Sequence, residues 1–147
     1  MRMFRAMETS ASALTAERLR MDVIANNLAN INTTRTAAGG PYRRRFITTA
    51  ERTQTFSDVL AAKQGEAPPV TGAGVVVTSI QEDPSDFKLK YDPSNPDADA
   101  QGFVRLPNVD MLTEITDMMM STRVYEANVT AFNAAKAMAV KALEIGK

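Results

Sequence analysis

Three consecutive arginines, Arg43, Arg44 and Arg45, are the residues of this chain best suited to bind anionic groups. Tyr42 and Phe46 flank them, and basic residues interleaved with aromatic ones are typical of nucleic-acid-binding segments. The rest of the sequence has no stripe of bases and no aromatic platform that would extend such a site. We therefore expect no nucleic-acid partner and predict that the arginines contact an acidic protein surface.

The segment containing Asn95, Asp97 and Asp99 places oxygen-bearing side chains at alternate positions, as at the start of a calcium-binding loop. Such a loop requires glycine at its sixth position and a bidentate glutamate at its twelfth. This sequence has Ala100 and Leu106 there. We interpret the segment as a solvated turn and expect no bound metal.

Residue types that perform catalysis are scarce. The chain has no cysteine and no histidine, which excludes thiol nucleophiles, cysteine-based metal sites and the commonest general base. Gly72-Ala73-Gly74 precedes a predicted strand, whereas a phosphate-binding loop follows one. No nucleophile and base can be paired, so the sequence predicts a protein that is not an enzyme and has no cofactor and no small-molecule substrate.

Both ends of the chain are expected to form long amphipathic helices, the first over residues 3–31. Steps of four and three residues trace an apolar stripe on each, and such a stripe must be buried against another helix. On the first helix the stripe is Met3, Met7, Ser10, Leu14, Glu17, Met21, Ile24, Leu28 and Ile31. On the second it is Met111, Ile115, Met118, Thr122, Tyr125, Val129, Phe132, Lys136, Ala139 and Leu143.

The second helix is predicted to begin after Pro107, with Asn108 as its N-cap, and to run to about Ile145. Asp110 and Glu114 would then face the positive end of the helix dipole. A helix of this length spans roughly 55 Å, whereas a small domain is only about 30 Å across. Much of the helix must therefore lie along a partner.

The middle of the chain has the pattern of three short strands, over residues 75–80, 87–91 and 102–106, which we expect to form one small sheet. We expect an α+β fold in which the terminal helices form an antiparallel, coiled-coil-like hairpin and a small β-rich domain lies between them. The predicted organisation is an N-terminal assembly helix over 1–34, a central domain over 35–107 and a C-terminal assembly helix over 108–147.

Four asparagines, Asn26, Asn27, Asn30 and Asn32, interrupt the end of the first helix. A buried asparagine in a helix seam fixes register at some cost in stability. Asparagine also favours helix ends over helix interiors. Two interpretations therefore stay open: a register or helix-terminating role, or plain surface polarity.

Several segments of the sequence resemble one protein family. Residues 20–34 are similar to the N-terminal signature of the bacterial flagellar rod, hook and hook-associated axial proteins, and residues 108–110, 123–128 and 136–147 to their C-terminal signature. Segments 34–44 and 92–104 resemble the proximal-rod members in particular. The resemblance covers nearly the whole chain and departs from the usual pattern only mildly, as at Ala13 and Asn95.

The resemblance implies a non-enzymatic subunit of the basal-body rod, the part of the flagellar drive shaft that crosses the periplasm. It implies assembly with other rod subunits and with further copies of the chain, and a contact with the membrane-embedded basal ring. It also implies passage through the flagellar type III export apparatus, and the N-terminal segment lacks the apolar core of a cleaved signal peptide.

In this interpretation the apolar stripes form the assembly interface and the three arginines become candidate inter-subunit contacts. The predicted interface residues are Leu14, Met21, Ile24, Asn27, Leu28, Ile31, Ile115, Met118, Tyr125, Val129, Phe132 and Leu143. An alternative from another class is a soluble helical adaptor or chaperone that binds partner helices.

Overall fold

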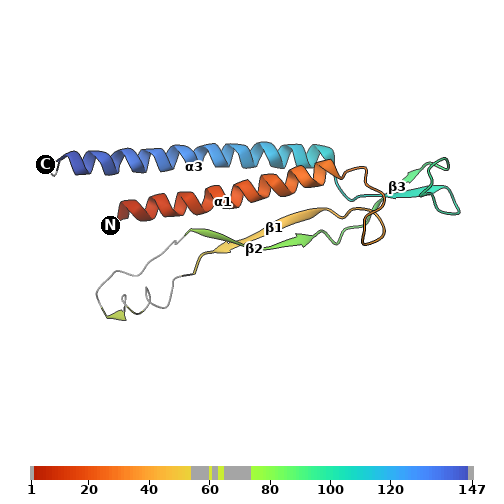
Figure 1. Ribbon diagram of the computed structural model, residues 1–147, viewed down its shortest axis with the longest axis horizontal. Helices are drawn as coiled ribbons and strands as arrows, with labels where there is room; N and C mark the ends of the chain where they lie inside the picture. Colours follow the sequence, from red (N-terminus) through yellow and green to blue (C-terminus); the bar gives the residue numbers. More distant parts are fainter. Residues whose placement is uncertain (1, 54–59, 61–62, 65–73, 146–147) are drawn as a thin grey trace. The chain divides into compact units, whose positions relative to one another are not determined.

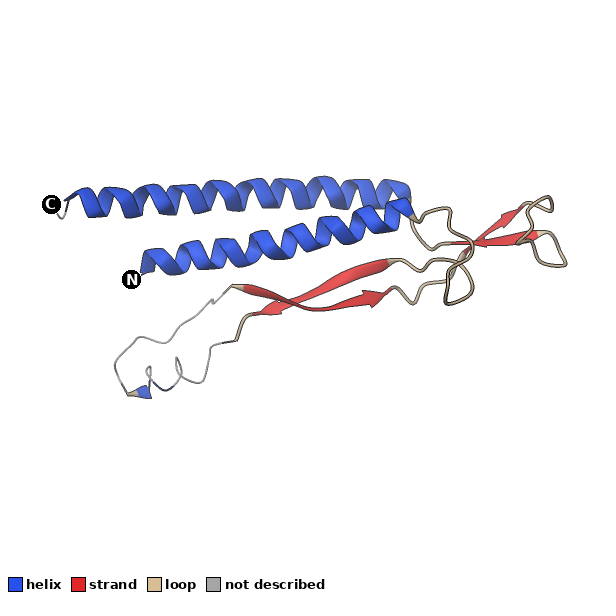
Figure 2. Ribbon diagram, in the orientation of Figure 1, coloured by secondary structure: helices blue, strands red, loops and turns tan. Residues whose placement is uncertain are grey.

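The computed structural model describes residues 2–53, 60, 63–64 and 74–145 and confirms the α+β fold. Helix α1 (Arg2–Ala29) opens the chain and helix α3 (Met111–Ile145) closes it (Figure 1). The strands lie between the two helices in sequence and pair as two separate two-stranded sheets (Figure 2). They are β1 (Arg45–Glu51), β2 (Val75–Glu82), β3 (Lys88–Tyr91) and β4 (Phe103–Leu106).

Helix α1 ends two residues before the predicted boundary, at the asparagine cluster. The backbone N–H of Asn30 is shared between the carbonyls of Asn26 and Asn27, at 3.2 and 3.3 Å. The Asn30 side chain also donates to the Asn26 carbonyl at 2.9 Å, and such local side-chain bonds to the backbone favour a helix end over a continued helix. Asn30 therefore terminates the helix, while Asn27 is completely buried.

Helix α3 is capped by Asp110, and the prediction of Asn108 as its N-cap was wrong. Asp110 Oδ1 accepts the backbone N–H of Thr113 at 3.1 Å, which is the N-cap hydrogen bond. Asn108 instead lies two residues before the cap, buried, with its side chain bonded to other segments. Both residues are good N-caps by type, so residue type alone did not decide between them.

The three predicted strands are present as β2, β3 and β4, but the prediction of a single three-stranded sheet was wrong. The prediction missed β1, which begins at the last of the three arginines. The run Phe46-Ile47-Thr48 carries the β-branched and aromatic residues that strands favour, and the adjacent charges obscured it. In the second sheet β3 and β4 are antiparallel, with Lys88 opposite Leu106 and Tyr91 opposite Phe103.

The chain divides into two compact units. The first comprises Met1–Arg18, Thr49–Thr78 and Thr122–Lys147, and the second comprises Leu19–Thr48 and Ser79–Ser121. The second unit, which we call the junction unit, buries Val104 and Val109 to 1 % exposure. No helix in the described part of the chain is long and apolar enough to cross a membrane.

In the first unit, the first residue of β2 is hydrogen-bonded to α1. Ser12 Oγ accepts the backbone N–H of Val75 at 3.1 Å and donates to the Thr9 carbonyl at 2.7 Å. Gly74 has a φ of +99° and lies so close that a Cβ there would collide with Ser12 Oγ. Glycine is therefore required at this position for both its backbone angle and its size.

Acid is expected to weaken the fold through Asp110. The hydrogen bond from the Thr113 backbone, followed by the bond and charge of the Lys88 ammonium, lowers the pKa of Asp110 below its ordinary value of 3.8. The unfolded chain then binds this proton more readily, so the stabilisation is complete above pH 3.8 and is lost as pH falls through the lower, folded pKa. Thermal melts of Asp110→Asn followed by circular dichroism should show a smaller loss of melting temperature on acidification than those of the unmodified chain. Identical pH dependence in the two proteins would contradict this assignment.

Candidate functional site

Asn27 is the centre of a buried polar cluster in the junction unit, which we call the polar junction: Asn27, Tyr42, Arg44, Asn108 and Glu114. The Asn27 side chain forms two hydrogen bonds with the backbone of Arg45: it donates to the Arg45 carbonyl at 2.8 Å and accepts the Arg45 N–H at 2.9 Å. Its second N–H reaches Glu114 Oε2 at 3.0 Å. Its oxygen also accepts the Tyr42 hydroxyl at 2.9 Å. All four hydrogen-bonding positions of the amide are thus occupied.

Glu114 and Arg44 form the charged part of the polar junction. Glu114 is fully buried, and its Oε1 accepts the Arg44 Nε–H at 2.6 Å. Arg44 is about a fifth exposed and also lies near Asp83 at 3.6 Å and Asp117 at 3.4 Å. Burial lowers the pKa of Arg44, but the hydrogen bond and charge of Glu114 outweigh burial and leave that pKa raised. Arg44 therefore keeps its positive charge and supplies the cationic partner that the buried carboxyl group of Glu114 requires.

Asn108 attaches the backbone around Arg44 to the turn that follows β2. Its Oδ1 accepts the Arg44 backbone N–H at 2.8 Å, and its amide donates to Ser85 Oγ, also at 2.8 Å. Asp83, in the same turn, accepts the Ser85 backbone N–H at 2.9 Å. This backbone bond is the largest cause of a lowered pKa at Asp83, followed by the Ser85 hydroxyl and the Arg44 charge.

Tyr42 completes the polar junction. The residue is 8 % exposed, and burial raises the pKa of its hydroxyl above the ordinary value of 10.0, although the charge of Arg45 opposes the rise. The hydroxyl therefore stays protonated and acts as the donor to Asn27. In the described residues, no buried side-chain nitrogen or oxygen is left without a hydrogen-bond partner. The junction thus joins α1, β1 and α3 and leaves no buried polar group free to bind a ligand.

The three arginines that we predicted as inter-subunit contacts all have partners within the chain. Arg43 donates to the Asp83 and Ser85 carbonyls and lies 4.4 Å from the centre of the Phe87 ring. Arg44 is held by Glu114. Arg45 forms an exposed ion pair with Glu82 at 3.1 Å. A contact with another subunit stays a prediction, and Arg45, which is half exposed, is the most accessible of the three.

The predicted interface residues of α1 are mostly half-buried. Ile24 is 5 % exposed and Asn27 is completely buried, so both serve the interior of the subunit. The remaining predicted residues of this part of the chain are of intermediate exposure: Leu14, Met21, Leu28 and Ile31.

On α3 the stripe of buried and half-buried residues lies beside the predicted one. Its members follow steps of four and three: Glu114, Met118, Ser121, Tyr125, Asn128, Phe132, Ala135 and Ala139. It shares Met118, Tyr125 and Phe132 with the predicted interface, and Val129 is half-buried beside it. Every second member is polar or small, which hydrophobic periodicity cannot detect.

The predicted residues Ile115 and Leu143 are exposed, by 42 % and 74 %. Ile115 belongs to a group that we call the α3 apolar face: Met111, Leu112, Ile115 and Met119. At about 100° per residue, these four positions fall within an arc of about 100° of the helix. Each is between 42 % and 75 % exposed, although large apolar side chains on one helix face normally require cover.

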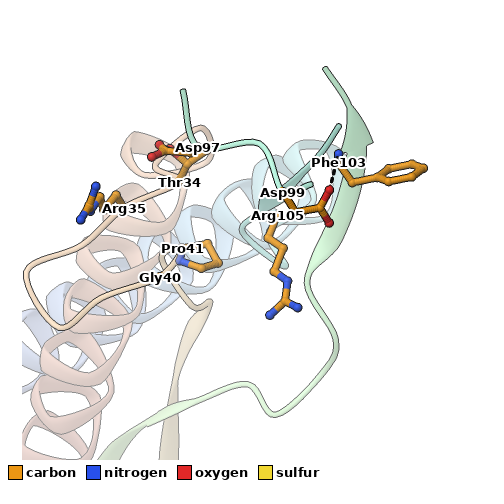
Figure 3. Close-up of a pocket in the computed structure, with 8 residues that line it drawn as sticks. All are labelled: Thr34, Arg35, Gly40, Pro41, Asp97, Asp99, Phe103 and Arg105. Atoms are coloured by element: carbon orange, nitrogen blue, oxygen red, sulfur yellow. Dashed lines mark hydrogen bonds between the residues drawn. The ribbon is translucent and has the colours of Figure 1, made fainter. Parts of the chain in front are cut away.

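A hollow of about 320 Å³ lies between the turn after α1 and the end of the β3–β4 hairpin (Figure 3). The two carboxylates that line the hollow, those of Asp97 and Asp99, already accept hydrogen bonds from within the chain. Asp97 accepts the Thr34 hydroxyl at 2.7 Å, and Asp99 accepts the backbone N–H groups of Gln101 and Phe103, each at 2.9 Å. The structure places no three histidine, cysteine, aspartate or glutamate residues of its described part where they could hold a metal ion. Residues lining the hollow are Thr34, Arg35, Gly40, Pro41, Asp97, Asp99, Phe103 and Arg105.

Sequence reasoning missed three members of the polar junction. It took Asn108 as a helix cap, Glu114 as a partner of the helix dipole and Tyr42 as the flank of a basic patch. The available signal was Glu114 itself, because a carboxylate beside Ile115 on an apolar helix requires a cationic partner if it is buried. An arginine triplet elsewhere in the chain could supply that partner.

Two family models match the two ends of the chain. Residues 7–35 match the flagella basal body rod protein family, and residues 100–145 match the C-terminal family of the flagellar basal body rod FlgEFG proteins. The chain is 51 % identical to the flagellar basal-body rod protein FlgC of Bacillus subtilis over 98 % of both chains. It is 43 % identical to FlgC of Borreliella burgdorferi, over 99 % of this chain and 98 % of that one. It is 36 % identical to FlgC of Salmonella typhimurium over the full length of both.

Replacement of Asn27 by alanine is expected to destabilise the chain strongly. It removes four hydrogen bonds and leaves the backbone groups of Arg45, the Tyr42 hydroxyl and one oxygen of Glu114 unsatisfied. We expect the free energy of unfolding to fall by about 2–4 kcal/mol. Urea denaturation of the purified chain, followed by circular dichroism, measures this loss.

The matched control is the exposed ion pair between Lys141 and Glu144, which lies outside the junction. Lys141→Ala is expected to change the free energy of unfolding by less than about 0.5 kcal/mol. Equal effects of Asn27→Ala and Lys141→Ala would show that the polar junction does not determine stability.

Proposed function

The chain belongs to the FlgC family of flagellar basal-body rod proteins and is a structural subunit of the rod, and we propose that it assembles through its two terminal helices. Its partners in the rod are other rod subunits, and we include further copies of the chain among them. The observation that carries the proposal is the α3 apolar face, where four large apolar side chains lie exposed on one side of a 35-residue helix.

The predicted interface residues with the lowest and the highest exposure have different roles. Ile24 and Asn27 are buried, so they hold the subunit together. Ile115 and Leu143 are exposed, so they are free to pack against a helix of another subunit. An exposed apolar patch on a structural protein favours a protein–protein contact, and a repeated heterologous contact produces an open filament.

The half-buried residues of the predicted interface belong to the same proposal. Each retains some accessible surface beside a buried neighbour, as expected at the edge of a helix seam. They are Leu14, Met21, Leu28, Ile31, Met118, Tyr125, Val129 and Phe132. On this basis residues 1–34 and 108–147 are the assembly helices, and residues 35–107 form the central domain between them.

Family membership supports a finer proposal for the location of the subunit. We propose that it lies in the proximal part of the rod, within the periplasm, and that it reaches this place through the flagellar type III export apparatus. A contact with the membrane-embedded basal ring belongs to the same proposal, with Arg45 and its neighbours as candidate residues. The names of the relatives support a rod subunit and give no support to a soluble adaptor.

Ile115→Asp is expected to abolish rod assembly without unfolding the subunit. Ile115 is 42 % exposed, so the purified variant should keep its free energy of unfolding within about 0.5 kcal/mol. A carboxylate on the α3 apolar face would, however, lose its water when packed against an apolar helix. The measurement is rescue of swimming and of basal-body rods in a flagellated host whose own copy of the gene is deleted.

Ile115→Leu is the matched control, because it keeps an apolar side chain of the same size, and it should restore swimming. Normal rods with Ile115→Asp would exclude the α3 apolar face as an assembly surface. Failure of the unmodified chain to rescue a host supplied with its other native rod proteins would count against the proposed function itself.

A further inference from the structure

One face of the β3–β4 hairpin is apolar and uncovered. The register places Leu89 opposite Arg105 and Tyr91 opposite Phe103, so these four side chains share one side of the sheet, which we call the hairpin outer face. Leu89 is 66 % exposed, Tyr91 63 % and Phe103 37 %. The opposite side contributes Val104, at 1 % exposure, to the interior of the junction unit.

The exposed aromatic rings are held in a defined arrangement. Tyr91 and Phe103 meet edge to face, with ring centres 5.3 Å apart and planes at 67°. Gly102 has a φ of +81°, and a Cβ at Gly102 would approach the Tyr91 ring to 2.9 Å. The Tyr91 ring therefore packs against the backbone of Gly102. Rigid, exposed aromatic residues beside an arginine are typical of the residues that dominate binding energy in protein interfaces.

The charge beside these rings points to the chemistry of the partner. Strands β3 and β4 carry Lys88, Lys90 and Arg105 and no acidic residue. Lys88 is bound to Asp110, whereas Arg105 has no ion pair or side-chain hydrogen bond with any residue in the described part of the chain. The nearby Asp99 accepts the backbone N–H groups of Gln101 and Phe103, and Figure 3 draws the bond from Phe103. The guanidinium of Arg105 thus remains available to a carboxylate from outside the chain.

We propose that the hairpin outer face binds an acidic segment of a neighbouring rod subunit. An apolar side chain of that segment packs on the Tyr91–Phe103 pair, and an adjacent carboxylate binds Arg105. The inference rests on the proposed function, because it requires the chain to be assembled into a rod. It concerns a surface outside the terminal helices.

Zero-length crosslinking tests the carboxylate directly. Arg105→Lys keeps the charge and supplies an amine, which a carbodiimide condenses with a neighbouring carboxylate to an amide, the reagent taking up the water. Basal bodies isolated from a rescued strain are treated with the carbodiimide and digested, and mass spectrometry identifies the linked peptides. The expected product joins Lys at position 105 to an aspartate or glutamate of another rod subunit.

Lys90 provides an internal control, because it lies on the opposite side of the same hairpin and carries the same amine. We expect its linkage to another subunit to be clearly weaker than that at position 105. Basal bodies that contain the Arg105→Lys chain but give no inter-subunit product at this position, or no more than at Lys90, would overturn the inference and leave the rod assignment intact.

Charge reversal gives an independent measurement. Arg105→Glu should reduce the swimming zone in soft agar severalfold, because it places a carboxylate against a carboxylate, whereas Lys90→Glu should have little effect. Circular dichroism of both purified variants shows whether the hairpin and helices are retained. Equal swimming of the two folded variants would contradict the proposal.

Discussion

The hydrogen bonds of the Asn27 amide are the constraint on which the rest of this subunit depends. The Asn27 side chain, on α1, pairs with both the backbone N–H and the backbone carbonyl of Arg45, as a neighbouring strand would. It also donates a hydrogen bond to the carboxylate of Glu114 on α3. Glu114 in turn fixes Arg44, and Asn108 fixes the backbone of Arg44 to the turn after β2. Segments far apart in sequence are thus joined by polar groups that all have hydrogen-bond partners within the chain, and a shift of any of these segments would leave a buried polar group unpaired.

This arrangement explains how the apolar surface of the terminal helices is distributed. A polar cluster in a helix seam favours one register, because each donor must face its acceptor. Such a cluster buries little apolar surface. On α3 the fully buried positions are Glu114, Ser121 and Ala135, while the larger side chains of Ile115 and Met119 stay exposed. The buried positions of this helix are thus polar or small, and the large apolar residues of the α3 apolar face remain available to other subunits.

The helices, the later strands and the α+β class follow from local pattern, because helical and strand periodicity survive in the sequence whatever the partners are. The polar junction could not be predicted, because it joins residues such as Asn27 and Glu114 that are 87 positions apart and individually resemble a surface asparagine and a helix-dipole carboxylate. Strand β1 was missed because the arginines before it suggested a charged patch. The exposed aromatic pair depends on the β3–β4 register and on Gly102, which only the folded backbone reveals.

The central claim, that Ile115 lies on a surface that other subunits cover, is tested most directly by the accessibility of a single thiol. The chain has no cysteine, so Ile115→Cys carries the only thiol of the subunit. A maleimide should label this thiol readily in the isolated protein and slowly in intact basal bodies. A separate variant, Lys141→Cys, carries its thiol at an exposed position and reports how well the reagent reaches the isolated protein and the basal bodies in general. Protection at position 115 on assembly is the predicted result, and equally fast labelling of this thiol in the isolated subunit and in the rod would contradict the account.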